Sequence, residues 1–187
     1  EANVSLASFT PASGTAVTQL AQNVFTLAGN VLRTAICRVT GTDDVMVLVS
    51  DLSGANQLKR FTSAGVDSGI TYTVTTTGAS TFLAGEASSS ANQVTIALRN
   101  ASECKVHSFN LTTGAEIGVG PFAAFAGDTA QQMTLVRTSS NTLRVIASIS
   151  SGTTPSIKTN NYTVSTNVFA GAVVAVTDAQ LTTVAAH

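Results

Sequence analysis

Turn signals divide the chain into short apolar segments and recur every ten to fifteen residues. Residues 41–44, 52–56 and 112–114 combine Gly with Asp, Asn, Ser or Thr, which are the residue types that form tight turns. The strand-sized segments between such turns mix alternation with β-branched residues, as residues 94–98 and 143–147 show. This pattern predicts an all-β protein built from antiparallel strands.

The segments also recur in the same order, which indicates an internal repeat. A phrase that reads Asn-x-Leu-Arg and ends in Gly-Thr begins at Asn30 and at Asn141, and a weaker copy begins at Asn92. These separations predict units of about 45 to 50 residues, with an insertion of about thirteen residues in the first unit. We expect about four strands per unit in a single all-β repeat domain over residues 1–187, with units at roughly 17–78, 79–127 and 128–176.

Four antiparallel strands in a unit of this length are typical of a β-propeller blade. Residues 47–51 form a hydrophobic strand that ends in Asp, and residues 57–65 form a strand that ends in Phe and a Gly turn. Together they resemble the blades of NHL-like and YVTN-like propellers. Residues 106–114 are a looser copy, and the third unit lacks the Gly turn after Tyr162. The resemblance implies propeller-like blades and identifies no site residue.

Three units cannot close a ring, because a closed propeller needs at least four blades. We therefore expect a partial propeller that belongs to a longer polypeptide or is completed by another chain. A β-sandwich or a β-solenoid is the alternative fold. The chain is expected to open with a last strand over residues 4–9 and to close with a first strand over residues 181–185. Both would lack partners, and unpaired edges bind strands of other protein chains.

Charge is the property in which the composition departs most from average. Asp, Glu, Lys and Arg make up 10% of the residues, against about 25% in typical domains. An uncharged polar surface favours an extracellular, adhesive or virion protein. A net charge of −1 without a basic run disfavours a nucleic-acid partner. No apolar segment reaches the roughly twenty residues of a membrane span.

Residue types that carry catalysis are sparse. The histidines are His107 and His187, and a lone histidine in a strand is expected to be structural. A zinc site needs three or four ligands at suitable spacing, so we predict no metal and no cofactor. A serine nucleophile would have only His107 as its base. Cys104 lies three residues before His107, which in a strand turns the two side chains to opposite faces. We therefore predict no catalytic residues and no enzymatic activity.

The remaining polar candidates favour structural roles. Asp43 and Asp44 are adjacent and are expected to form a turn, not a glycosidase pair or a calcium loop. For Cys37 and Cys104, two isolated thiols are favoured over a disulfide. Asn-x-Ser/Thr sequons are about as frequent as chance predicts, and they begin at Asn3, Asn100, Asn110 and Asn161.

These features indicate a non-enzymatic structural or assembly module of an extracellular or virion surface, whose partners are copies of itself or other chains. The alternative is a receptor- or glycan-binding propeller domain of a phage tail or bacterial surface protein. The chain has no Trp, so Tyr72 or Tyr162 would have to supply the aromatic platform for a sugar. A third candidate is a piece of a propeller hydrolase or lactonase whose catalytic residues lie in other blades.

Overall fold

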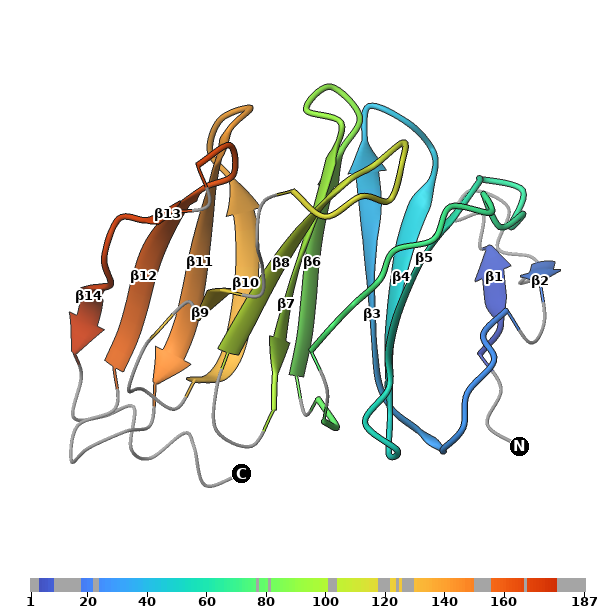
Figure 1. Cartoon of the computed structure of the whole chain (residues 1–187), viewed down its shortest axis with the longest axis horizontal. Coiled ribbons are helices and arrows are strands. Elements are labelled where there is room, and N and C mark those ends of the chain that lie inside the picture. The colour runs from blue at the N-terminus through green and yellow to red at the C-terminus, as the bar shows by residue number, and fades with distance from the viewer. Residues whose placement is uncertain are drawn as a thin grey trace.

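Strands, turns and loops account for all of the structure described. The computed structural model describes residues 4–8, 18–21, 24–76, 78–80, 82–100, 104–117, 122–123, 125, 130–149, 156–166 and 168–177. No helix occurs in these ranges, so none of their elements is a helix that could cross a membrane. The all-β prediction is confirmed (Figure 1). The strands are β1 (Leu6–Ser8), β2 (Thr18–Ala21), β3 (Val31–Thr40), β4 (Val45–Asp51), β5 (Asn56–Phe61), β6 (Phe82–Ser88), β7 (Gln93–Arg99), β8 (Cys104–Asn110), β9 (Phe122–Ala123), β10 (Ala130–Arg137), β11 (Thr142–Ile149), β12 (Ser156–Thr163), β13 (Val168–Phe169) and β14 (Val173–Thr177).

Three groups of strands repeat one antiparallel meander. We call them the first group (β3–β5), the second group (β6–β9) and the third group (β10–β14). The second strands of the groups begin at Val45, Gln93 and Thr142, at intervals of 48 and 49 residues. Each group ends in a short outer segment, such as β9 beside β8 or the bridge of Tyr72 to Leu58. Antiparallel repeats of the predicted length, with the strand order of a propeller blade, are thus present.

The sequence match through Asn30 does not mark equivalent places. Asn30 precedes β3, a first strand, whereas Asn92 and Asn141 precede the second strands β7 and β11. Because the second strands are evenly spaced, the expected insertion of about thirteen residues in the first unit is not there. The match was misleading because Asn favours the turn before any strand, whichever strand of the unit follows.

The N-terminal strand has a partner, contrary to the expectation of an unpaired end. β1 covers Leu6–Ser8 of the expected strand over residues 4–9 and pairs antiparallel with β2. The expected strand over residues 181–185 lies outside the described residues.

Side chains on both faces of a group are buried, because successive residues of a strand point to opposite sides. On β4, Met46 and Leu48 face the second group, while Val47 and Val49 pack on the other side with Phe25. The described core therefore consists of layers between sheets. Each aliphatic side chain buried in such a layer contributes about 1.5 to 3 kcal/mol to folding.

The first strands β3, β6 and β10 lie in a row through the middle of the molecule (Figure 1). β3 and β6 pair in parallel at one end, through Val39 with Ala87 and Thr40 with Ser88. At Gly85, an added Cβ would lie 3.1 Å from the Sγ of Cys37, so a larger residue would press on Cys37 where the two strands face each other. A row of first strands is also how blades meet around the axis of a propeller.

An ion pair joins the first strands of the second and third groups. Nε and Nη2 of Arg137 on β10 donate to Oε1 and Oε2 of Glu86 on β6, at 2.9 and 2.6 Å. Nη1 of Arg137 donates to Oε1 of Gln93 at 3.2 Å. Both charged side chains are largely buried. The two-point geometry fixes the relative position of the two strands, which a single-point contact would not do.

The turn of Gly114 in the second group contacts the first group directly. Gly114 has φ +74°, and a Cβ built on it would overlap the carbonyl oxygen of Thr71. Gly69 has nearly the same backbone angle, φ +73°, but nothing lies within 4 Å of its added Cβ. The two glycines therefore separate the cost of a left-handed backbone from the cost of a close contact between groups.

We expect Gly114→Ala to lower the free energy of unfolding by about 3 kcal/mol or more, because backbone strain adds to an overlap with backbone atoms. Gly69→Ala is the matched control and should lose only about 1 kcal/mol, from its left-handed backbone. Urea unfolding followed by circular dichroism measures both losses. Equal losses in the two variants would show that the contact of Gly114 with Thr71 does not constrain the fold.

Candidate functional site

The adjacent acids Asp43 and Asp44 lie in the predicted turn, and each has its own cationic partner. Asp43 accepts a hydrogen bond from Nη2 of Arg38 at 2.7 Å in a fully exposed pair. Asp44 accepts from Nε and Nη2 of Arg60 at 2.8 and 2.6 Å. Across the described ranges, no three His, Cys, Asp or Glu side chains gather closely enough to hold a metal ion.

Three residues that the sequence did not connect form a buried polar network between the first and second groups. Nε2 of His107 lies 2.6 Å from Oγ1 of Thr76, and its Nδ1 lies 2.8 Å from Oε1 of Glu116. His107 is on β8, Glu116 follows the turn after β8, and Thr76 belongs to the segment after β5. His107 is 0% exposed and Thr76 is 7% exposed, whereas Glu116 lies nearer to solvent.

The surroundings of His107 favour its neutral form. Burial lowers the pKa of His107 below its ordinary value, because the charged ring would lose its hydration. The carboxylate of Glu116 opposes this shift, and the charge of Lys105 adds to it. A neutral imidazole donates from one nitrogen and accepts at the other. Donation from Nδ1 to Glu116 leaves Nε2 to accept the hydroxyl hydrogen of Thr76, so all three residues are satisfied.

The order hydroxyl, imidazole, carboxylate is the order of a nucleophile, its base and an orienting acid in acyl transfer. A nucleophile must also be reached by a substrate, and Thr76 and His107 are enclosed between two packed groups. The groove on the described surface is lined by other residues. As it stands, the geometry supports a role in joining the groups.

The opposite orientation of Cys104 and His107 on β8 is confirmed. Cys104 packs in the layer toward the third group, where its Sγ contacts Met133, while His107 faces the first group. Cys104 and Cys37 are both free, as expected of two isolated thiols. Burial raises the pKa of each thiol to about 12; the charge of Glu86 adds to the shift at Cys37. Neither thiol is therefore a ready nucleophile.

An exposed tyrosine platform for a sugar is not present at either expected position. Tyr72 and Tyr162 are both buried. The hydroxyl of Tyr72 donates to the carbonyl of Leu111 at 2.7 Å, and its ring packs edge-on against Phe109. Tyr162 packs against Phe169 in the third group. The large apolar area of each ring fills the layers between the strands instead.

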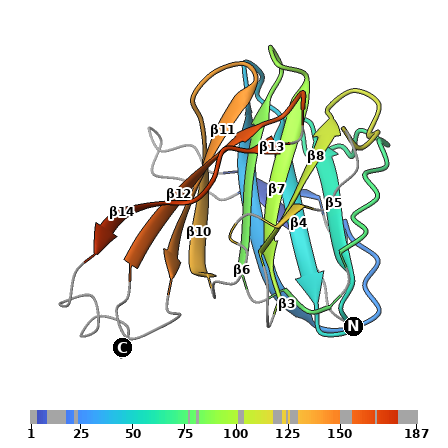
Figure 2. The same cartoon turned by 60° about the vertical axis from the view of Figure 1, so that its left-hand side comes forward.

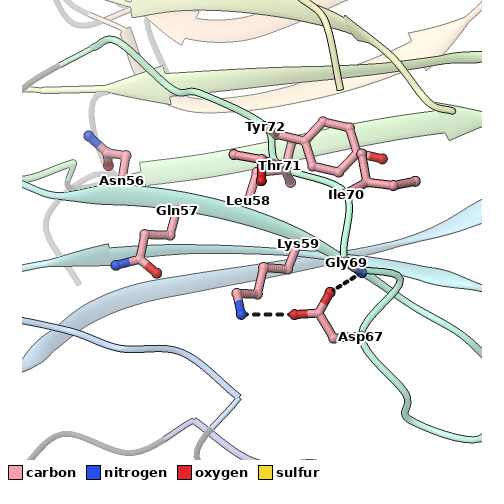
Figure 3. Close-up of a pocket in the computed structure, with 9 residues that line it drawn as sticks. All are labelled: Asn56, Gln57, Leu58, Lys59, Asp67, Gly69, Ile70, Thr71 and Tyr72. Carbon is pink, nitrogen blue, oxygen red and sulfur yellow. Dashed lines mark hydrogen bonds and ion pairs between the residues drawn. The ribbon is translucent and has the colours of Figure 1, made fainter. Parts of the chain in front are cut away.

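A groove of about 370 Å³ lies between β5 and residues 67–72 (Figure 3). It exists because this outer segment pairs with β5 only at isolated bridges. Figure 3 shows Nζ of Lys59 and Oδ2 of Asp67 in contact, at 2.8 Å, with the backbone N–H of Gly69 donating to the same carboxylate. Burial raises the pKa of Asp67, but these hydrogen bonds and the Lys59 charge outweigh it, so the pKa is lowered overall. Asn56 and Gln57 add polar groups to a lining that also includes the apolar side chains of Leu58 and Ile70.

The third group has one face that no described strand covers. On that face Thr134 and Val136 of β10 stand opposite Ile146 and Arg144 of β11, and Ile146 stands opposite Thr159 of β12. We call these residues the outer face of the third group. Thr134, Val136 and Arg144 are exposed, whereas their neighbours on the opposite face are buried against the second group. Figure 2 shows the third group at the left of the molecule. The second group lies to its right.

No family model matches this chain, and no curated protein is similar to it. The candidate sites therefore have to be judged by their own geometry.

Sequence reasoning singled out one member of the buried network and missed the other two. His107 drew notice because the chain has two histidines. Glu116 was within reach of prediction, because the bridge between Phe109 and Glu116 closes a hairpin around the turn at residues 111–114. Thr76 is one of several threonines in its segment, and only the packing of two groups brings it to His107.

At pH 8 we expect neither thiol of the native protein to react with iodoacetamide within minutes, because a pKa of about 12 leaves about one thiol in ten thousand ionised. In denaturant, both Cys37 and Cys104 should be alkylated. Intact-mass spectrometry counts the adducts. Rapid alkylation of the native protein at Cys104 would contradict the packed layer between the second and third groups.

Proposed function

We propose that this chain is a structural module of an extracellular or virion surface, and that its copies assemble through the outer face of the third group. One observation carries the proposal. The second group covers one face of the first group, and the third group covers one face of the second, whereas no described strand covers the corresponding face of the third group, on which Val136 is 45% exposed.

The covered faces show what kind of surface the open face fits. Leu48 of the first group packs in one layer with Ile96 of the second. Ala97 of the second group packs in the next layer with Val145 of the third. The first layer lies between the two halves of one seven-stranded sheet that is joined through β3 and β6, and the next layer lies between that sheet and the five-stranded sheet of the third group. A second copy of this chain supplies sheets of the same repeat, and it is the partner that we propose.

The composition of the outer face suits such packing. Threonine, valine and isoleucine give a flat, β-branched surface of the kind that sheets use against one another. Arg144, its charged residue, is held by Oδ1 of Asn161 at 3.0 Å. At the opposite end of the row Ile36 on β3 is 63% exposed, while Val47 and Val49 of β4 are covered there by Phe25. Low overall charge, 10% of residues, supports the extracellular or virion setting.

We expect the native particle to have a mass of at least twice 19.0 kDa by light scattering. Val136→Lys places a charge in the outer face, where Val136 is 45% exposed, and should return the chain to a single copy. Val66→Lys is the matched control, because Val66 is 61% exposed in a turn away from this face, and its particle should keep the wild-type mass.

A wild-type particle of 19.0 kDa would overturn the proposal. An assembly that Val136→Lys leaves intact would show that copies meet through another surface. A particle in which a different chain accompanies this one would make that chain the partner in place of a second copy.

A second candidate function, recognition of a glycan, is favoured by the groove beside β5. Its volume, about 370 Å³, is in the range of small-molecule sites, and the side chains of Gln57, Lys59 and Asp67 offer donors and acceptors for hydroxyl groups.

On a glycan array, this candidate predicts saturable binding that Asp67→Ala weakens about tenfold or more, because the variant removes an acceptor and frees Lys59. Asp43→Ala, at an exposed carboxylate outside the groove, is the control and should bind as the wild type does. An array without hits would remove the glycan candidate.

A further inference from the structure

We propose that Thr76, His107 and Glu116 form an acid-sensitive latch, which holds the first and second groups together at neutral pH and loosens their junction in mild acid. The latch lies at the contact between the two groups, because Thr76 comes from the first and His107 and Glu116 from the second. His107 is 0% exposed there, so a proton that it takes up becomes a buried charge.

Hydrogen bonding explains why protonation weakens the contact. In the neutral state the hydroxyl of Thr76 donates to Nε2 of His107 at 2.6 Å. A protonated ring donates from both nitrogens, so the hydroxyl of Thr76 has to turn its hydrogen elsewhere. No second partner for this hydroxyl occurs among the hydrogen bonds of the described residues. A buried donor left unsatisfied favours opening of the junction to water.

Few charges face His107 to compensate a proton. Among the described residues, Glu116 is the one acid in contact with the ring, at 2.8 Å, and it lies at the solvent edge of the network. Lys105, on the same strand, disfavours a second positive charge. From the first group, residues 70–80 carry no charged side chain, and Tyr72 stays neutral because burial raises its pKa to about 12. On the side of the third group, burial likewise raises the pKa of Tyr162.

The direction of the pH effect follows from linkage. An exposed histidine has a pKa of about 6.5, and burial lowers the pKa of His107 in the closed junction. The open state therefore binds more protons, so the stability of the junction is complete above about pH 6.5 and falls as the pH drops below it. Asp51 and Asp67, whose pKa values are also lowered, begin to act only below about pH 4.

The test uses the full chain labelled at histidine, whose two imidazoles give two titration curves by NMR. His107→Gln removes one of the curves and so assigns it. We expect the midpoint of that curve to lie below about 6.5. Hydrogen exchange, corrected for intrinsic rates, should be about tenfold or more faster at pH 5 than at pH 7.5 in residues 70–76 and 104–110. Exchange in β11, outside this junction, should not change with pH.

A midpoint at or above 6.5, or exchange at the junction that does not depend on pH, would overturn the latch.

If His107→Gln does not fold, Glu116→Gln provides an independent test. Removing the carboxylate takes away the one contact that favours the proton, so the His107 midpoint should fall further. Thr76→Val keeps the His107 ring but removes the hydroxyl of Thr76. It should weaken the junction at pH 7.5 and reduce the difference in hydrogen-exchange rate at the junction between pH 7.5 and pH 5. A rise of the midpoint in Glu116→Gln, or an undiminished pH difference in Thr76→Val, would also count against the latch.

Discussion

Apolar side chains on both faces of a second strand need a neighbouring sheet on each side, and the architecture depends on meeting that need. β4 and β7 show this need most fully, because successive residues in the middle of each strand are buried alternately on its two faces. A two-sheet sandwich has one interior layer, whereas this pattern requires a succession of layers. The repeat of about fifty residues supplies the sheets for that succession, and the first strands β3, β6 and β10 hold them in a row.

The charged and imidazole groups of Arg137 and His107 are tolerated inside the layers because each has partners of matching geometry. The guanidinium of Arg137 meets both oxygens of Glu86, and His107 is bonded at both of its nitrogens. In a chain with so few charges these contacts also fix which parts of neighbouring groups meet, since apolar contacts alone tolerate sliding. The His107 network differs from the ion pair of Arg137 in one respect, because an imidazole is a group that can take up a proton in mild acid, whereas a guanidinium stays charged.

The same layering is the basis of the proposed assembly through the third group. Its inner face is buried like those of the other groups, whereas its outer face repeats the strand pattern without a described sheet over it. A face of this kind is suited to another sheet, and the chain itself contains three groups that stack in this way. The groove beside β5 has a different origin, because it follows from the sparse pairing of one outer segment in the first group.

The all-β fold and the length of its repeat were predictable from the sequence, because strand length and turn chemistry are local properties that alternation and glycine positions record. The phase of the repeat was not, since Asn30 marks a turn before a first strand and Asn92 a turn before a second one. His107 was visible as a rare residue, but its partner Thr76 depends on how two groups pack, which no local pattern encodes. Burial of Tyr72 and Tyr162, the pairing of Arg137 with Glu86 and the open outer face were likewise decided by tertiary structure, because each depends on contacts between residues far apart in the chain.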